Sequence, residues 1–255
     1  MVSPVMLTPL AGVKLVEPGD DLGAIALAAL AANGVAPQAG DVLVVAQKIV
    51  SKAEGRYVDV KTVEPSEPAI ALAAETEKDP RFVEIVLGES KRVVRRRPGL
   101  LIVEHRLGFV MANAGIDHSN IPAGDGVERV LLLPEDPDGS AERLRQRIAD
   151  TYGVPVAVIV SDSFGRAWRK GTVGIALGAA GLPAVIDMRG QPDLFGRELL
   201  VTETGFADEI AAAAGLVMGQ ADEAIPMVLV RGLDWSAPEV PAAALVRPAE
   251  HDLFR

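Results

Sequence analysis

The chain has 255 residues, a net charge of −10 at pH 7 and an isoelectric point of about 4.9, an acidity that argues against a general affinity for nucleic acid. The absence of cysteine excludes disulfides, thiolate nucleophiles and zinc–sulfur sites. No stretch has the apolar length of a membrane span and the N-terminus lacks a secretory pattern, so we expect a cytoplasmic protein without a membrane partner.

Helical and extended patterns are mixed in the first part of the chain. Residues 20–34 are predicted to form a helix that begins at an aspartate and ends at Asn-Gly. The first half of residues 41–56 is a strand pattern that follows Gly40. Residues 67–90 predict two helices broken at Pro80, because the residue before a proline avoids helical geometry.

Strands are adjacent in the middle of the chain. Residues 93–115 predict successive strands with turns at Pro98-Gly99 and Arg106-Leu107. These adjacent strands break the alternation of a doubly wound sheet, so the pattern favours an α+β fold with a mixed sheet. The later elements are a turn and helix in 136–153, a buried strand in 154–163, a helix in 205–219 and a strand in 225–233.

Two further segments have an unusual composition. The basic run Lys91–Arg97 is interpreted as the solvated edge of a strand, with a phosphate-binding patch as the alternative. Residues 246–255 are polar and contain proline, which is typical of a tail or the start of a linker.

Common catalytic motifs are missing. The sequence has no GxxxxGK[ST] and no GxGxxG after a strand, which removes the common phosphate-binding loops. It also has no HExxH and no GxSxG, the signatures of common zinc proteases and serine hydrolases. The three histidines are too scattered to indicate a metal triad.

Two aspartates, Asp117 and Asp162, each follow a hydrophobic strand pattern, where a rigid scaffold can present chemistry. If both entered one pocket, they would repel by roughly 4 kcal/mol at about 4 Å and an effective dielectric near 20. A hard divalent cation would remove that cost, and oxygen-only ligands suit Mg²⁺ or Mn²⁺. The alternative is that Asp117 caps a turn and Asp162 caps the segment that follows it.

Basic residues accompany these aspartates. Arg166, Arg169 and Lys170 follow Asp162, a combination that can neutralise a phosphate, although an exposed basic loop would look the same. Lys52, in the segment SKAEGR, could clamp a phosphate as a point charge.

Two acidic segments remain. DPDGS, residues 136–140, is interpreted as a helix cap. GQADEAIP, residues 219–226, offers Gln220, Asp222 and Glu223 in a loop between a helix and a strand. Such a loop can wrap a nucleotide or hold a second metal, but most loops of this kind do neither.

Taken together, these segments resemble the coenzyme F420-0:L-glutamate ligase family, which adds γ-linked glutamates to a deazaflavin coenzyme precursor. The resemblance covers nearly the whole chain, and its segments occur in the family's order. They are PGDDL (18–22), GDVLVVAQKIVSKAEGR, NAGIDHSN, LLPEDPDGSAERLR, VIVSDSFGRAWRKG, DLFGREL, VTETGFADEIAAAAGLVMG and VRG.

The resemblance implies a ligase that uses GTP, Mn²⁺ or Mg²⁺, and K⁺. GTP would phosphorylate the terminal carboxylate of the lactyl-phosphate side chain of coenzyme F420-0, and the amine of L-glutamate would displace the phosphate. It also implies a domain of two interleaved subdomains over residues 1–245 and an intertwined homodimer. The end of the chain, 246–255, resembles the junction to a nitroreductase-like domain in bifunctional relatives.

The resemblance also assigns residues to roles. It implies metal ligands at Asp117, Asp162, Ser163 and Gln220, and catalytic roles for Asp117, Asp162, Lys52 and Arg166. Its GTP contacts fall on Val13, Lys14, Leu15, Val16, Gln47, Lys52, Asn120, Met218, Gly219, Gln220, Ala221, Asp222, Glu223, Ala224 and Ile225.

Three positions depart from the family's pattern. Gln47 stands where relatives have a small hydroxyl residue, Ser163 replaces threonine, and Gln220 lies where some relatives have glutamate. Two other functions stay open: a paralogous metal- and nucleotide-dependent amide ligase acting on another acid, and a non-catalytic GTP-binding module.

Overall fold

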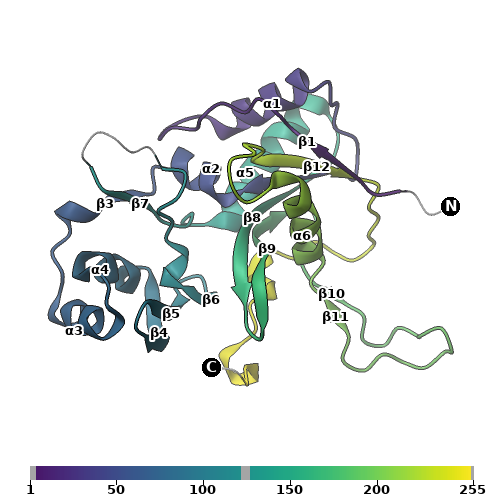
Figure 1. The fold of residues 1–255 in the computed structure, drawn as a ribbon. Helices are drawn as coiled ribbons and strands as arrows, with labels where there is room; N and C mark the ends of the chain where they lie inside the picture. The colour runs from purple at the N-terminus through teal and green to yellow at the C-terminus, as the bar shows by residue number, and fades with distance from the viewer. Residues whose placement is uncertain (1–3, 122–126, 254–255) are drawn as a thin grey trace. The chain divides into compact units, whose positions relative to one another are not determined.

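The computed structural model describes residues 4–121 and 127–253 and consists of two compact units (Figure 1). Each unit is assembled from segments that are separated in sequence, so the chain passes between them more than once, and one of these crossings falls within helix α2 (Gln47–Ala53). Unit 1 comprises Met1–Val16, Asp20–Val50 and Glu135–Leu245; unit 2 comprises Glu17–Gly19, Ser51–Pro134 and Val246–Arg255.

Unit 1 is built on a five-stranded sheet with the order β1-β12-β2-β8-β9. Strands β2 and β8 are parallel and the other neighbours are antiparallel, so the sheet is mixed and the predicted α+β class is confirmed. The strands are β1 (Met6–Pro9), β2 (Val42–Ala46), β8 (Ala157–Arg166), β9 (Arg169–Ala180) and β12 (Met227–Arg231).

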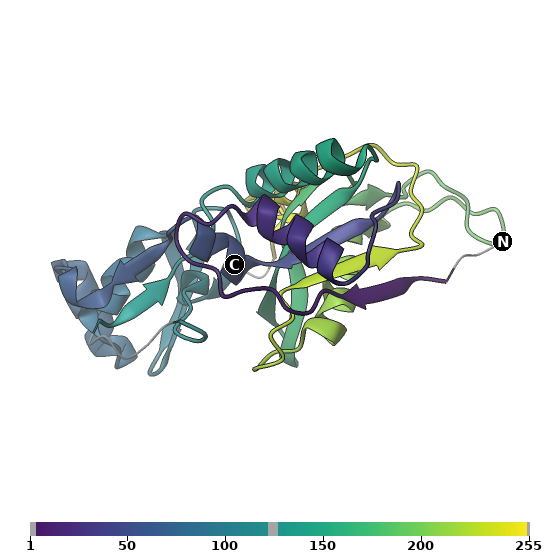
Figure 2. The ribbon, with the colours of Figure 1, turned by 90° about the horizontal axis from the view of Figure 1, so that it is seen from above.

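Helices cover both faces of this sheet (Figure 2). On one face, α6 (Phe206–Met218) packs its alanines and Ile210 against alternate residues of β2, including Val42 and Val44. On the other, α5 (Pro137–Tyr152) lies on β8 and β9, with α1 (Leu22–Ala32) beside it. Because successive strand side chains point to opposite faces, the nearly continuous apolar sequence of β2 fits burial on both sides.

The predicted helix ends in unit 1 are confirmed. Asp21 caps α1 by accepting a hydrogen bond from the Ala24 N–H, and Asp136 caps α5 in the same way from Gly139. The DPDGS segment is therefore structural, as predicted.

Strand β9 was not expected from the sequence, because its glycines weaken a strand pattern. They are required by close packing. A Cβ on Gly174 would lie 2.5 Å from the main-chain oxygen of Ala211 in α6, and one on Gly178 would lie 2.1 Å from that of Pro137 in α5. A bulge between the two glycines turns them toward opposite faces of the sheet.

A buried ion pair joins two of the segments that carry the family resemblance. Arg231, at the end of β12, donates to both carboxylate oxygens of Asp41 at 2.8 and 2.6 Å. Asp41 is only 1% exposed, and the bidentate geometry satisfies its charge. These residues of the GDVLVV and VRG segments therefore hold two sheet strands together.

Unit 2 combines two small antiparallel sheets with two helices. Its core packs α3 (Glu67–Thr76) and α4 (Pro80–Gly88) against strand β5, and the break between the helices falls at Pro80 as predicted. The sheets are β4-β5-β6 (Ser90–Arg97, Leu100–His105, Val110–Ala112) and β3-β7 (Tyr57–Asp59, Arg129–Leu131). Strand β4 holds the basic run and is an exposed edge strand, which confirms the predicted solvated edge.

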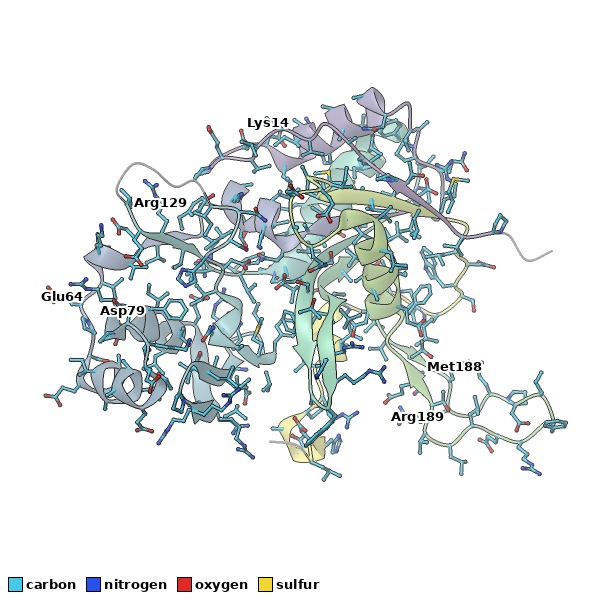
Figure 3. All side chains as sticks on the ribbon, in the orientation of Figure 1. Lys14, Glu64, Asp79, Arg129, Met188 and Arg189 are labelled. Carbon is cyan, nitrogen blue, oxygen red and sulfur yellow. The ribbon has the colours of Figure 1, made fainter. Side chains whose placement is uncertain are left out.

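An arm extends from unit 1 between residues 186 and 204 (Figure 1). It starts and ends with the short paired strands β10 (Ile186–Asp187) and β11 (Glu203–Thr204). Arg189, labelled with Met188 in Figure 3, forms an ion pair with Asp187 at its base. Its outer part exposes four large apolar side chains, Leu194, Phe195, Leu200 and Val201.

The remaining elements are short 3-10 turns: η1 (Val60–Thr62), η2 (Asn113–Gly115), η3 (Ala242–Leu245) and η4 (Ala249–His251). Residues 246–253 group with unit 2, and the last two residues of the predicted tail lie outside the described residues. In the described ranges, no helix has the length and apolar character needed to cross a bilayer.

Candidate active site

The NAGIDHSN segment follows β6 and folds into a left-handed turn. Asn113, Ala114 and Gly115 have φ angles of 51°, 54° and 68° in succession. Glycine suits the third position, because its φ of 68° strains other residues and an added Cβ would lie 2.5 Å from Met111 Cε and 3.1 Å from Leu133. Beyond the turn, the backbone of Asp117 exchanges two hydrogen bonds with Leu131 of β7, at 2.9 and 3.0 Å. The Asp117 backbone is therefore held by β7.

The same segment meets the end of α2 within unit 2. The Lys52 ammonium donates a 2.6 Å hydrogen bond to the main-chain carbonyl of Asn120. Asn120 itself has a φ of 57°. The structure thus brings together two of the residues that the sequence assigned to nucleotide binding.

A buried charge cluster supports the position of α2. Glu89 receives hydrogen bonds from the guanidinium groups of Arg56 and Arg106, at 3.0 and 3.2 Å. Arg56 also binds the Leu133 carbonyl through Nε, and its backbone N–H donates to the Ser51 carbonyl at the end of α2. Burial would raise the pKa of Glu89, but the neighbouring His105 and the two arginines outweigh it and lower the pKa to about 2.

His105 completes this cluster. It is fully buried, and its Nδ1 accepts the Leu107 N–H at 3.0 Å. The neutral ring then carries its proton on Nε2, which lies 3.4 Å from Glu89, a long contact for a hydrogen bond. Sequence reasoning treated the histidines as scattered and missed this role, because the partners come from three distant segments.

Asp162 lies inside strand β8, which continues past the end of the strand predicted for residues 154–163. The parallel pairing with β2 ends at Ser161, and from Asp162 onward β8 pairs only with β9. The residue therefore stands one position beyond the buried centre of the sheet, which argues against the alternative that it caps a following segment. One carboxylate oxygen accepts the N–H of Ser163 at 2.8 Å.

Strands β8 and β9 continue past Asp162 as a hairpin. Arg166 and Arg169 are its last paired residues, so the predicted basic loop is a tight hairpin turn. Arg166 donates to the Lys170 carbonyl at 3.4 Å. Trp168, in the turn, was not assigned a role by sequence reasoning; it is 86% exposed and has a φ of 65°.

The loop from Met218 to Ile225 directs its backbone N–H groups at one carboxylate. The Ala221 N–H donates to Glu223 at 2.8 Å. Hydrogen bonds from the backbone of Ala221, of Glu223 itself and of Gln220 hold the pKa of Glu223 below its usual value. Gly219 permits this fold, since a Cβ there would lie 2.0 Å from the Glu223 carboxyl carbon. Converging N–H groups of this kind can receive an anion.

The other predicted nucleotide contacts lie on two segments of unit 1. Lys14, labelled in Figure 3, is exposed in the loop between β1 and α1 and pairs with Asp20 at 2.6 Å. In the same loop Leu15 is exposed and Val16 is buried. Gln47 is the first residue of α2 and is buried, so its side chain is enclosed by protein.

The predicted metal ligands divide between the units. Asp117 belongs to unit 2, whereas Asp162, Ser163 and Gln220 belong to unit 1. Among the described residues, no three Asp, Glu or His side chains gather in an arrangement that could hold a metal. The predicted donors are all oxygen atoms, which suits Mg²⁺, Mn²⁺ or K⁺ in chemical type.

Left-handed backbone is concentrated in the predicted site segments. Among the described residues, six that are not glycine have a positive φ, and one of these, Glu77, simply ends helix α3. The other five lie in NAGIDHSN, in the β8–β9 turn and in the loop after α6: Asn113, Ala114, Asn120, Trp168 and Ala224. Asparagine tolerates this conformation, but it costs Ala114, Trp168 and Ala224 of order 1–3 kcal/mol each. Such residues persist where the surrounding structure enforces them, often at functional sites.

Comparison with known proteins places the chain in one family. The pattern of the family F420-0:Gamma-glutamyl ligase matches residues 12–232. The coenzyme F420:L-glutamate ligase of Methanothermobacter thermautotrophicus is 45% identical over 246 residues, covering 96% of both chains. The Methanopyrus kandleri protein of the same name is 47% identical over 249 residues, covering 95% of this chain and 94% of the relative. With more than four-fifths of the sequence matched, the chain belongs to the F420-0:gamma-glutamyl ligase family.

Proposed function

We propose that this protein is a GTP-dependent ligase that adds L-glutamate to coenzyme F420-0 through γ-linked amide bonds. The observation that carries the proposal is the full-length similarity to proteins named coenzyme F420:L-glutamate ligase. Similarity along nearly the whole chain matters here, because the residues for such a reaction come from several segments.

The reaction would proceed in two steps. A carboxylate oxygen of the F420-0 side chain attacks the γ-phosphorus of GTP, and GDP leaves. The glutamate amine then attacks the acyl carbon, the bond from that carbon to the phosphate oxygen breaks, and the amine loses a proton. A carboxylate is a poor electrophile, so the phosphate serves to supply a leaving group.

Three groups of this chain would handle the phosphates. Lys52, whose ammonium group donates to the Asn120 carbonyl, would bind phosphate oxygens through the same ammonium group. Arg166 would stabilise the transferring phosphoryl group with its guanidinium. The N–H groups that hold the Glu223 carboxylate would hold a phosphate after that side chain swings away.

The Lys14–Val16 loop, Val13 and Gln47 are proposed to contact the rest of GTP, together with Asn120 and the Met218–Ile225 loop. Lys14 would exchange its Asp20 partner for the nucleotide. The buried position of Gln47 leaves its role in nucleotide binding the least supported of these.

Metal ions would be held by oxygen donors. We propose Asp117 and Asp162 as ligands of Mn²⁺ or Mg²⁺, and Ser163 and Gln220 as ligands of a second ion, with K⁺ as a further requirement. Bound cations would neutralise phosphate charge during the reaction. The chain's own contribution is to fix Asp117 through its pairing with β7 and Asp162 through the β8–β9 ladder.

We also propose a homodimer. The exposed Leu194, Phe195, Leu200 and Val201 of the arm form an apolar surface of the kind that a second copy would cover. Replacing Leu194 and Phe195 with serine should reduce the mass measured by sedimentation to that of a monomer. An unchanged mass would argue against the arm as the contact.

The test is mass spectrometry of F420-0 incubated with the protein, GTP, L-glutamate, Mn²⁺ and K⁺. Products heavier by successive glutamyl units, absent without GTP, would support the proposal and count the added residues. Products from another acid alone would favour a paralogous ligase. GTP binding by folded protein without any product would favour a non-catalytic GTP-binding module.

A further inference from the structure

We propose that Trp168, at the tip of the β8–β9 hairpin, stacks on the flat conjugated ring of the acceptor substrate. The inference rests on the proposed function. It assigns binding of the deazaflavin ring to Trp168, a residue without a role in the reaction proposed above.

The turn places the indole in an exposed position. Only Ala167 and Trp168 connect the last paired residues, Arg166 and Arg169. The Trp168 side chain is 86% exposed, and the hairpin extends beyond the neighbouring strand β2. Figure 1 shows β8 and β9 continuing together to this tip.

The backbone at Trp168 argues against a purely structural role. Its φ of 65° belongs to the left-handed region, where glycine or asparagine would fit with least strain. The other tryptophan, Trp235, is partly buried, lies 5.9 Å from the Phe206 ring and packs on the core of unit 1. Core packing therefore explains Trp235 but not Trp168.

The charges around the tip indicate which class of aromatic ligand would bind there. Arg166, Arg169 and Lys170 flank the indole in a protein whose net charge is −10. These cations attract an aromatic ligand that also carries phosphate. Stacking on the indole gives further binding energy and requires only that the ligand have a flat conjugated ring.

The position along the hairpin fits a substrate whose ring and reacting group are separate. Asp162 lies four residues before Arg166 on the same strand, roughly 13 Å at the usual rise per residue. The reacting carboxylate of the proposed acceptor is at the end of a side chain. Holding the ring at the tip would leave that side chain free to run back along the hairpin toward Asp162.

The kinetic test compares Trp168→Gly with Trp168→Phe. The glycine variant removes the ring and relieves the strained φ, so its thermal midpoint should stay the same or rise. Its KM for F420-0 should increase about 5- to 100-fold, the range expected for loss of one aromatic stack. The KM values for GTP and L-glutamate should not change, and the phenylalanine variant should recover most of the affinity for F420-0.

A binding measurement separates this inference from the proposed function. The chain has two tryptophans, so Trp235→Phe leaves Trp168 as the only indole. Titrating F420-0 without GTP or glutamate should quench the Trp168 emission, with free tryptophan as the control for absorption by the ligand. Quenching without any ligated product from the wild type would support the stacking and reject the proposed reaction.

Two results would overturn the inference. One is ligation by the wild type with an unchanged KM for F420-0 in Trp168→Gly, which would leave the reaction standing. The other is a lower mass in sedimentation for Trp168→Gly together with Trp168 emission that F420-0 does not quench in the Trp235→Phe protein, which would make Trp168 a contact between copies.

Discussion

Lys52 and Asn120, 68 residues apart, are joined by a 2.6 Å hydrogen bond from the Lys52 ammonium to the Asn120 carbonyl. The bond ties the end of α2 to the polar end of the NAGIDHSN segment. In the proposed function, the positive charge of this ammonium group also binds a phosphate. We propose that the same side chain both holds the loop and binds the nucleotide.

Replacing Lys52 with glutamine should therefore lower kcat/KM by about 10- to 100-fold, the usual cost of losing a charged hydrogen bond to a phosphate. Steady-state kinetics with GTP as the varied substrate would measure this. Lys91→Gln, an exposed lysine on β4, removes the same charge from unit 2 and should have little effect. Equal rates for Lys52→Gln and the wild type would show that Lys52 only holds the loop.

The two aspartates should be needed for activity but not for folding. Asp117→Asn and Asp162→Asn keep the shape of each side chain and remove its charge, so ligation should fall at least about 100-fold if each binds a metal. Mn²⁺ binding followed by electron paramagnetic resonance gives a second readout. Asp150→Asn, on the exposed face of α5, is the matched control. A wild-type rate in either variant would make its assignment as a metal ligand wrong.

The Glu89 cluster predicts a pH dependence of stability. The folded-state pKa of about 2 lies below the ordinary value of 4.5, so the stabilisation is complete above pH 4.5 and is lost as the pH falls toward 2. The difference corresponds to about 3 kcal/mol, and Glu89 is mostly buried. Unfolding in urea at pH 7 and pH 3 would measure the part lost by pH 3, about 2 kcal/mol.

Glu89→Gln provides the comparison for that experiment. It leaves Arg56 and Arg106 without their carboxylate, so it should destabilise the protein at pH 7 and reduce the loss of stability between pH 7 and pH 3. A variant that loses as much stability as the wild type over this range would place the acid sensitivity elsewhere.

Gly178→Ala should destabilise unit 1, because the added methyl would lie 2.1 Å from the Pro137 carbonyl oxygen. Overpacking against backbone typically costs about 1–3 kcal/mol. Gly215→Ala is the matched control: it lies within α6, no atom is within 4 Å of the added Cβ, and alanine favours helix. Its thermal midpoint should rise by a few degrees. If both variants behaved alike, close packing of α5 on β9 would not explain Gly178.

Local patterns predicted most of the elements but not their long-range partners. The caps at Asp21 and Asp136 and the break at Pro80 follow from side-chain chemistry within a few residues. Strand β9 was not predicted because glycine in a local pattern favours a turn. Its glycines are required by close contact with helices that are distant in sequence.

The site was predictable to a similar degree. The segments around Asp117, Asp162 and Glu223 were identified from composition and resemblance, whereas the contact between Lys52 and Asn120 depends on a fold that local sequence does not specify. The asparagine and glycine of Asn-Ala-Gly indicated a turn, and both residue types tolerate the positive φ found there. Nothing in the local pattern indicated that Trp168 would share that conformation.

The order of strands in unit 1 bears on how a newly made chain reaches its native state. Strand β2 (Val42–Ala46) has β8 on one side and β12 on the other, and both are synthesised long after it. Until Met227–Arg231 leaves the ribosome, a fully apolar strand has an unpaired edge that other chains could join. Truncation anywhere before β12 should therefore give an aggregating product, and chaperones that shield exposed strands should matter most during this interval.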